Sequence, residues 1–194
     1  MEKGKAYANR TANYKFNDSD YYPTPKSLVW KLVETGVLDK KQTIYEPAAG
    51  DGSITLALRD SGFTVYEDDI RTTGKDFLTN ESYNSQIVTN PPFSLFDEFV
   101  EKAKESADLV VFIAKTNFFG AYKRWDKGVW KNLRDIYVFN RQVDYRTPVR
   151  DDGQFHVGNL ITGWFVWDKK WTENYWRTQI INVQDYATLG QFKE

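Results

Sequence analysis

Four consecutive residues, Asn90-Pro91-Pro92-Phe93, have the groups needed to hold a planar amine. They follow residues 86–89, which read as a buried strand, and the two prolines end that strand because proline donates no ladder hydrogen bond. The turn offers the Asn90 carboxamide oxygen and the Pro91 carbonyl as acceptors, and Phe93 offers a flat apolar face. A planar amino group stacked on Phe93 would donate both its N–H groups to these oxygens. The alternative is a plain strand-to-helix turn.

A second candidate site is the turn Pro47-Ala48-Ala49-Gly50-Asp51-Gly52, between a short strand at 43–46 and a helix that Ser53 is expected to cap. Its small residues let a ligand approach the backbone closely, and its glycines allow positive φ. The pattern is neither a dinucleotide fingerprint nor a P-loop. Glu46 and Asp51 favour a cationic or hydroxyl-bearing ligand, unless they are simply solvated acids beside a tight turn.

Acidic and aromatic residues after the second predicted strand, 63–66, are suited to a nucleoside. The strand runs into Glu67-Asp68-Asp69, and an acid at this position can accept both hydroxyls of a ribose. We expect Asp69 to do so, with Asp68 as the alternative. Asp76 and Phe77 could bracket an adenine ring, one by a hydrogen bond and the other by its face.

The elements that must position these residues follow from periodicity and turn signals. Thr24 and Pro25 predict a helix start, with Thr24 as the cap, and Gly36 ends that helix. Another helix follows Phe93, with its apolar residues on one side. Further strands are predicted at 109–114, buried on both faces, at 136–139, and at 160–167, where alternation and aromatic residues suit an edge strand.

Composition excludes several classes of chemistry. The 194 residues include no cysteine and one histidine, so disulfides, thiolate metal sites and cysteine nucleophiles are excluded, and a His-based metal site or a Ser-His triad is disfavoured. We expect His156 to be a loop or edge-strand residue, and the tryptophans at 164, 167, 171 and 176 to serve packing. No apolar run reaches the ~20 residues of a membrane span and no signal peptide is visible, which favours a cytoplasmic protein. We expect no bound metal.

Charge is distributed unevenly along a chain whose net charge is −1. Residues 115–150 hold nine Lys or Arg and three Asp, a net charge of +6. This segment is a candidate polyanion-binding face, or alternatively solvated helix surface. The candidate phosphate-binding residues are Lys115, Lys123, Arg124, Lys127, Arg141 and Arg146.

The order of these motifs resembles S-adenosylmethionine-dependent amino-methyltransferases, and more narrowly the small phage-type DNA N6-adenine methyltransferases. The resemblance rests on YPTP, EPAAGDG, DDI, DFL, NPPF, FIAKTNFFG and TGWFVWDK, in that order. It implies an α/β, Rossmann-like fold: a mostly parallel seven-stranded sheet with an antiparallel late strand and helices on both faces. The resemblance covers residues 21–170, the expected catalytic domain. The polar residues 1–20 are expected to form a flexible lead, and the apolar residues within 171–194 are expected to pack this tail on the domain.

The resemblance assigns roles to individual residues. It places the methionine moiety of the cofactor along Tyr22, Pro23, Thr24 and Pro25. It puts the cofactor turn at Glu46, Ala48, Gly50 and Gly52, the ribose at Asp69, and the adenine of the cofactor at Asp76 and Phe77. It implies that the target base is held by Asn90, Pro91, Pro92 and Phe93. A DNA base would have to be flipped out or single-stranded to reach them.

Two departures from the family pattern leave alternatives open. Only 101 residues follow Phe93, so we expect no separate target-recognition domain, and the stretch between Asp69 and Asp76 is short. The same chemistry on RNA or on a protein glutamine is one alternative. A non-catalytic protein that binds nucleic acid or a partner is another. A cytosine amine is less favoured, and the oligomeric state is not indicated.

Overall fold

The computed structural model describes residues 22–81, 84–143, 145 and 160–183. The predicted lead at 1–20, Arg146, His156 and the end of the tail lie outside the described residues. So does most of the connection at 140–158.

The described residues form a seven-stranded sheet in the order β2-β1-β3-β4-β6-β5-β7. β6 runs antiparallel to both its neighbours, and every other neighbouring pair is parallel. This confirms the expected α/β class, the mostly parallel sheet and the late antiparallel strand. The strands are β1 (Ile44–Glu46), β2 (Val65–Glu67), β3 (Asn84–Thr89), β4 (Ala107–Lys115), β5 (Leu133–Phe139), β6 (Thr162–Asp168) and β7 (Arg177–Ile181).

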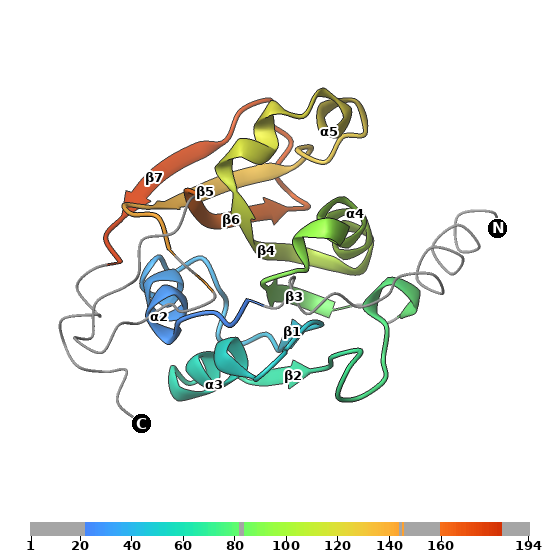
Figure 1. Cartoon of the computed structure of the whole chain (residues 1–194), viewed down its shortest axis with the longest axis vertical. Helices are drawn as coiled ribbons and strands as arrows, with labels where there is room; N and C mark the ends of the chain where they lie inside the picture. The colour runs from blue at the N-terminus through green and yellow to red at the C-terminus, as the bar shows by residue number, and fades with distance from the viewer. Residues whose placement is uncertain (1–21, 82–83, 144, 146–159, 184–194) are drawn as a thin grey trace.

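Helices cover both faces of this sheet, with α2 and α3 on one side and α4 and α5 on the other (Figure 1). Within the described ranges, no helix combines the length and the apolar character needed to cross a membrane. The α-helices are α2 (Lys26–Glu34), α3 (Ser53–Asp60), α4 (Phe96–Ser106) and α5 (Tyr122–Asp126), and the 3₁₀ turns are η2 (Phe77–Thr79), η3 (Phe93–Leu95) and η4 (Thr116–Gly120).

Strand β4 divides the apolar core into two layers because its side chains alternate between the faces. Val111 and Ile113 pack in the cluster that includes α2 and α3. Val110 and Phe112 pack in the cluster that includes α4. The near-continuous apolar run 109–114 therefore reflects burial on both faces, as the sequence predicted.

Strand β6 is not the edge strand that the sequence analysis expected for 160–167. It lies between β4 and β5, and residues 162–167 are all buried. Trp164 and Trp167 serve packing, as expected, but they do so in the core, on opposite faces of the sheet and each in a different layer. The edge position belongs to β7, within the segment expected to be a tail, where four of five residues are exposed.

Two helices begin one residue away from their predicted caps. Pro25, not Thr24, is the N-cap of α2, and no side chain caps this end. Gly52, with φ of 78°, is the N-cap of α3, and the Ser53 hydroxyl donates to Asp51. The left-handed conformation at Gly52 is one that a residue with a Cβ adopts only with strain. Because Thr24 does not cap α2, its hydroxyl is available for a contact outside this helix.

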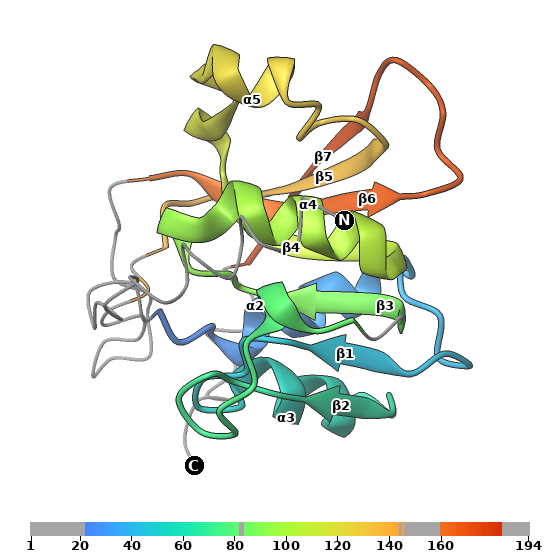
Figure 2. The same cartoon turned by 90° about the vertical axis from the view of Figure 1, so that its right-hand side faces the viewer.

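The order of connections places the candidate residues at one edge of the sheet. From β1 the chain moves outward to β2 and then returns to β3 on the other side of β1. The β1 and β3 arrows point the same way in Figure 2, so their carboxyl ends lie together. Such a switch point is where open α/β sheets bind ligands.

We predict that Gly163→Ala destabilises the protein. A Cβ at this position in β6 would come within 2.5 Å of the Tyr137 carbonyl oxygen and 3.0 Å of the Val138 Cα, both main-chain atoms that cannot rotate away. The free energy of unfolding should fall by about 1–3 kcal/mol in a urea titration.

Gly120→Ala is the matched control, because a Cβ at Gly120 would meet nothing within 4 Å. It should change the free energy of unfolding by less than about 0.5 kcal/mol. Equal stability of the two variants would contradict the tight β5–β6 contact.

Candidate active site

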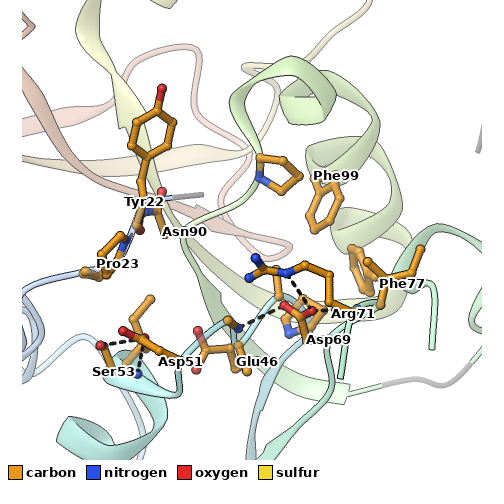
Figure 3. Close-up of a pocket in the computed structure, with 18 of the residues that line it drawn as sticks. Tyr22, Pro23, Glu46, Asp51, Ser53, Asp69, Arg71, Phe77, Asn90 and Phe99 are labelled. Carbon is orange, nitrogen blue, oxygen red and sulfur yellow. Dashed lines mark hydrogen bonds and ion pairs between the residues drawn. The ribbon is translucent and has the colours of Figure 1, made fainter. Parts of the chain in front are cut away.

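A cavity of about 230 Å³ opens where β1 and β3 end, and most of the predicted site residues line it (Figure 3). Tyr22 and Asn90 lie on one side of the cavity, and Phe77 and Phe99 lie on the other. The predicted residues that line the cavity are Tyr22, Pro23, Thr24, Glu46, Ala48, Gly50, Asp69, Asp76, Phe77, Asn90 and Pro92.

Four predicted residues do not line this cavity. Pro25 and Pro91 are buried, and Gly52 shapes the turn as the left-handed N-cap of α3. Phe93 is partly buried and packs against Tyr22, with ring centroids 5.5 Å apart, and against Phe118 at 5.9 Å. The ammonium of Lys115 lies 4.2 Å from the Phe93 centroid. The ring expected to stack on a base thus already has aromatic and cationic neighbours.

The Asn90 side chain forms hydrogen bonds through its nitrogen but not through its oxygen. Its Nδ2 donates to the Tyr22 carbonyl at 3.0 Å and to the Thr24 Oγ1 at 3.2 Å. Its Oδ1 is buried and has no hydrogen-bond partner. A buried acceptor without a partner carries a free-energy cost that a donor placed beside it would remove. Asn90 also lines the cavity, so this unpartnered acceptor belongs to a residue of the cavity wall.

Glu46 ends β1 and is only 1% exposed. Its Oε2 accepts a 2.6 Å hydrogen bond from the Thr55 hydroxyl. Burial raises the pKa of Glu46 to about 8, against the lowering effect of the Thr55 hydrogen bond. At neutral pH the side chain is therefore largely protonated. A cation placed beside it would lower its pKa and favour the ionised carboxylate.

Asp69 ties the second strand to the glycine turn. Its Oδ2 accepts from the Gly50 N–H at 2.9 Å, and its Oδ1 accepts from the Arg71 N–H at 2.8 Å. Oδ1 also accepts from the Arg71 Nε at 3.4 Å, so the acceptor position left for a hydroxyl proton is the second lone pair of Oδ2. The alternative, Asp68, is not among the residues around the cavity; it is 2% exposed and bonds Tyr45 and Lys75.

The far wall of the cavity is aromatic. Phe77 is buried and packs against Phe99 of α4, with ring centroids 5.1 Å apart. Asp76 accepts a hydrogen bond from the Leu78 N–H, which fixes the start of η2. Together they place a flat apolar surface beside a carboxylate, the combination expected for an adenine ring.

Several residues around the cavity were not predicted. Phe99 was recognised as a core residue of its helix but not as part of the site. Arg71 and Lys75 come from the short stretch after Asp69, which has no periodicity, and both line the cavity. Arg71 lies beside Asp69, with its Nε 3.4 Å from Oδ1. Nothing in the local sequence pattern indicates that these two cations face the same space as the acids.

The predicted basic residues differ in their surroundings. Lys123 and Lys127 are exposed at α5, whereas Arg141 is partly buried. Arg124 forms a 2.5 Å ion pair with Asp97, and its guanidinium lies 4.3 Å from the Phe118 centroid. Its charge is therefore already neutralised by a neighbour. In the part of the chain that the structure describes, no group of three or more His, Cys, Asp or Glu is arranged to hold a metal ion.

Comparisons with known proteins identify the fold. No protein-family model and no curated protein matches the sequence. Among solved structures, a proposed RNA methyltransferase from Pyrococcus horikoshii matches with a TM-score of 0.59 and 16% identity, over 87% of this chain and 99% of that one. The modification subunit of a proposed type I restriction enzyme from Vibrio vulnificus YJ016 matches with a TM-score of 0.55 and 14% identity, over 92% and 51%.

A third solved structure, the 23S rRNA methyltransferase ErmE, matches with a TM-score of 0.51 and 18% identity, over 80% of this chain and 72% of that one. The chain spans about half of the Vibrio vulnificus protein but nearly all of the Pyrococcus horikoshii protein. At these identities the likeness concerns the fold. The chain therefore has the Rossmann-like fold of these methyltransferases.

Proposed function

We propose that this protein is an S-adenosylmethionine-dependent methyltransferase that acts on the exocyclic amino nitrogen of adenine in DNA. The observation that carries the proposal is the buried, unpartnered Oδ1 of Asn90 in the wall of a cavity shared with the Gly50 turn. An acceptor without a donor, beside a turn suited to a nucleoside-bearing ligand, fits an amine substrate next to this cofactor.

The residues around the cavity fit S-adenosylmethionine group by group. Asp69 has a lone pair on Oδ2 left for a ribose hydroxyl, and Asp76 and Phe77 offer a carboxylate and a ring face for the adenine. Tyr22 and Pro23 would flank the methionine portion. Glu46 would lose its proton when the positively charged cofactor binds beside it. When bound, the cofactor supplies a methyl group already activated by a positively charged sulfur.

Asn90 and Pro91 would activate the amine. The lone pair of an exocyclic adenine amine is delocalised into the ring, which makes it a poor nucleophile. Hydrogen bonds to the Asn90 Oδ1 and the Pro91 carbonyl would turn the N–H groups out of the ring plane and localise the lone pair. Positive charge then grows on nitrogen, so these oxygens stabilise the transition state more than the ground state.

The choice of DNA rests on the motif resemblance, and RNA is the second candidate. Two of the structurally similar proteins are described as RNA methyltransferases, and one is the modification subunit of a restriction enzyme. The exposed Lys123 and Lys127 suit the phosphates of either nucleic acid. A panel of adenine-containing DNA, adenine-containing RNA and a glutamine peptide would identify the acceptor.

We predict that Asn90→Ala lowers kcat about 100-fold or more, because the variant loses an acceptor whose bond strengthens in the transition state. Transfer of a radiolabelled methyl group to unmodified DNA measures this loss. The affinity for S-adenosylmethionine, measured by calorimetry, should fall much less than kcat, since its only expected change comes from the lost Nδ2 contacts to Tyr22 and Thr24.

Asn174→Ala is the control, because Asn174 is exposed on the β6–β7 connection, away from the cavity. Full activity of Asn90→Ala would reject the mechanism. A wild-type protein that does not bind S-adenosylmethionine would favour the non-catalytic alternative instead.

We also predict that the affinity for S-adenosylmethionine rises about tenfold between pH 6 and pH 7. The free protein holds a proton on Glu46, whose pKa is about 8, and a cationic ligand favours the carboxylate. Binding then releases a proton, so each unit by which the pH rises below the pKa increases the observed affinity about tenfold. Calorimetric titrations at the two pH values measure the change.

Glu46→Gln is the matched variant for this prediction. Glutamine keeps an oxygen that accepts from the Thr55 hydroxyl but has no proton to release. Its affinity should be nearly the same at pH 6 and pH 7. A dependence as steep as that of the wild type would place the titrating group elsewhere.

A further inference from the structure

The Asn90 carboxamide is held at its nitrogen end by the segment that precedes α2. Both hydrogens of Nδ2 have acceptors, the Tyr22 carbonyl and the Thr24 hydroxyl oxygen, which lie 68 and 66 residues away in the sequence. We propose that these two contacts form an orientation lock, which turns the Asn90 oxygen toward the substrate amine. The proposal rests on the proposed function for its catalytic consequence.

The partner at Tyr22 fixes which end of the carboxamide faces the lock. A main-chain carbonyl has only lone pairs, so the atom 3.0 Å from it must be the Asn90 nitrogen. Rotating the carboxamide by half a turn would set Oδ1 against the Tyr22 carbonyl oxygen. It would also point the NH₂ group at the incoming amine, donor against donor. Both effects disfavour the flipped state, so the lock selects one of two nearly isosteric orientations.

A free asparagine has no such preference, because its terminal torsion is broad and roughly two-fold. Without the lock, an acceptor is presented to the amine only part of the time, and the buried NH₂ group is left partly unpaired. The lock therefore supplies catalytic orientation before the substrate arrives, as preorganised sites do.

The segment that forms the lock is itself stiff. Thr24 lies between Pro23 and Pro25, so one ring fixes the preceding φ and the other restricts Thr24 to extended conformations. Thr24 is 4% exposed, which keeps water from competing for its hydroxyl. Its hydroxyl is also free of a helix-capping role, since Pro25 is the N-cap and α2 has no side-chain cap.

Thr24→Val and Thr24→Ser test the proposal as a matched pair. Valine keeps the shape of threonine but removes the acceptor, so kcat should fall about tenfold while KM for the nucleic acid changes by less than about threefold. Serine keeps the hydroxyl and should retain kcat within about twofold. A purely structural role for Thr24 would respond to the lost methyl group in serine rather than to the lost hydroxyl.

Asn90→Asp gives a second signature, which does not depend on position 24. The ionised carboxylate keeps an acceptor for the amine but sets an oxygen against the Tyr22 carbonyl. Only the protonated carboxyl can donate there while its other oxygen accepts from the substrate. The activity of Asn90→Asp should therefore rise as the pH falls below neutrality, relative to the wild type at each pH.

The side-chain amide protons of Asn90 report on the lock without any enzyme assay. In the wild type and in Thr24→Ser they should exchange slowly with solvent in NMR spectra, and in Thr24→Val they should exchange faster. Wild-type kcat in Thr24→Val, or unchanged amide exchange, would overturn the lock. An inactive wild type with the expected exchange pattern would instead reject the proposed function and leave the lock standing.

Discussion

The parallel pairing of β1 with β3 is the constraint on which the cavity depends. The register Ile44↔Gln86 and Tyr45↔Ile87 sets the two strand ends side by side, although about 40 residues separate them along the chain. Glu46 and Asn90 then line one cavity. Because both strands are buried, a slip of one residue would move apolar side chains to the wrong face and displace both polar groups. The precision of the site thus comes from the packing of the sheet.

The glycine turn depends on a contact from a different strand. The Gly50 N–H is satisfied by Asp69, so the turn after β1 is braced by the residue that follows β2. The Ala49 N–H likewise donates to the Asp68 carbonyl. A turn of small residues has few side-chain contacts to fix its conformation. These two hydrogen bonds fix it instead. Asp69 therefore serves both the shape of the cavity and its charge.

The sequence could predict features whose cause is local. The two prolines after Thr89 had to end a strand, and the apolar run 109–114 had to be buried on both faces. Features with a long-range cause were missed. Thr24 was assigned to a cap because capping rules consider only neighbouring residues, whereas its partner is Asn90. The interior position of β6 depends on its long-range pairing with β4 and β5. Arg71 lines the cavity although it belongs to a short stretch without periodicity.

The contact between Asn90 and Tyr22 uses a main-chain carbonyl, and this has an evolutionary consequence. Replacing the side chain at position 22 cannot delete that carbonyl, whereas replacing Thr24 can delete its hydroxyl. The contact to the Tyr22 carbonyl therefore survives point substitution, whereas the contact to the Thr24 hydroxyl can be lost by it. Over long divergence, the contact made by the carbonyl of position 22 should survive a change of side chain there, while position 24 should exchange mainly between the two β-hydroxyl amino acids.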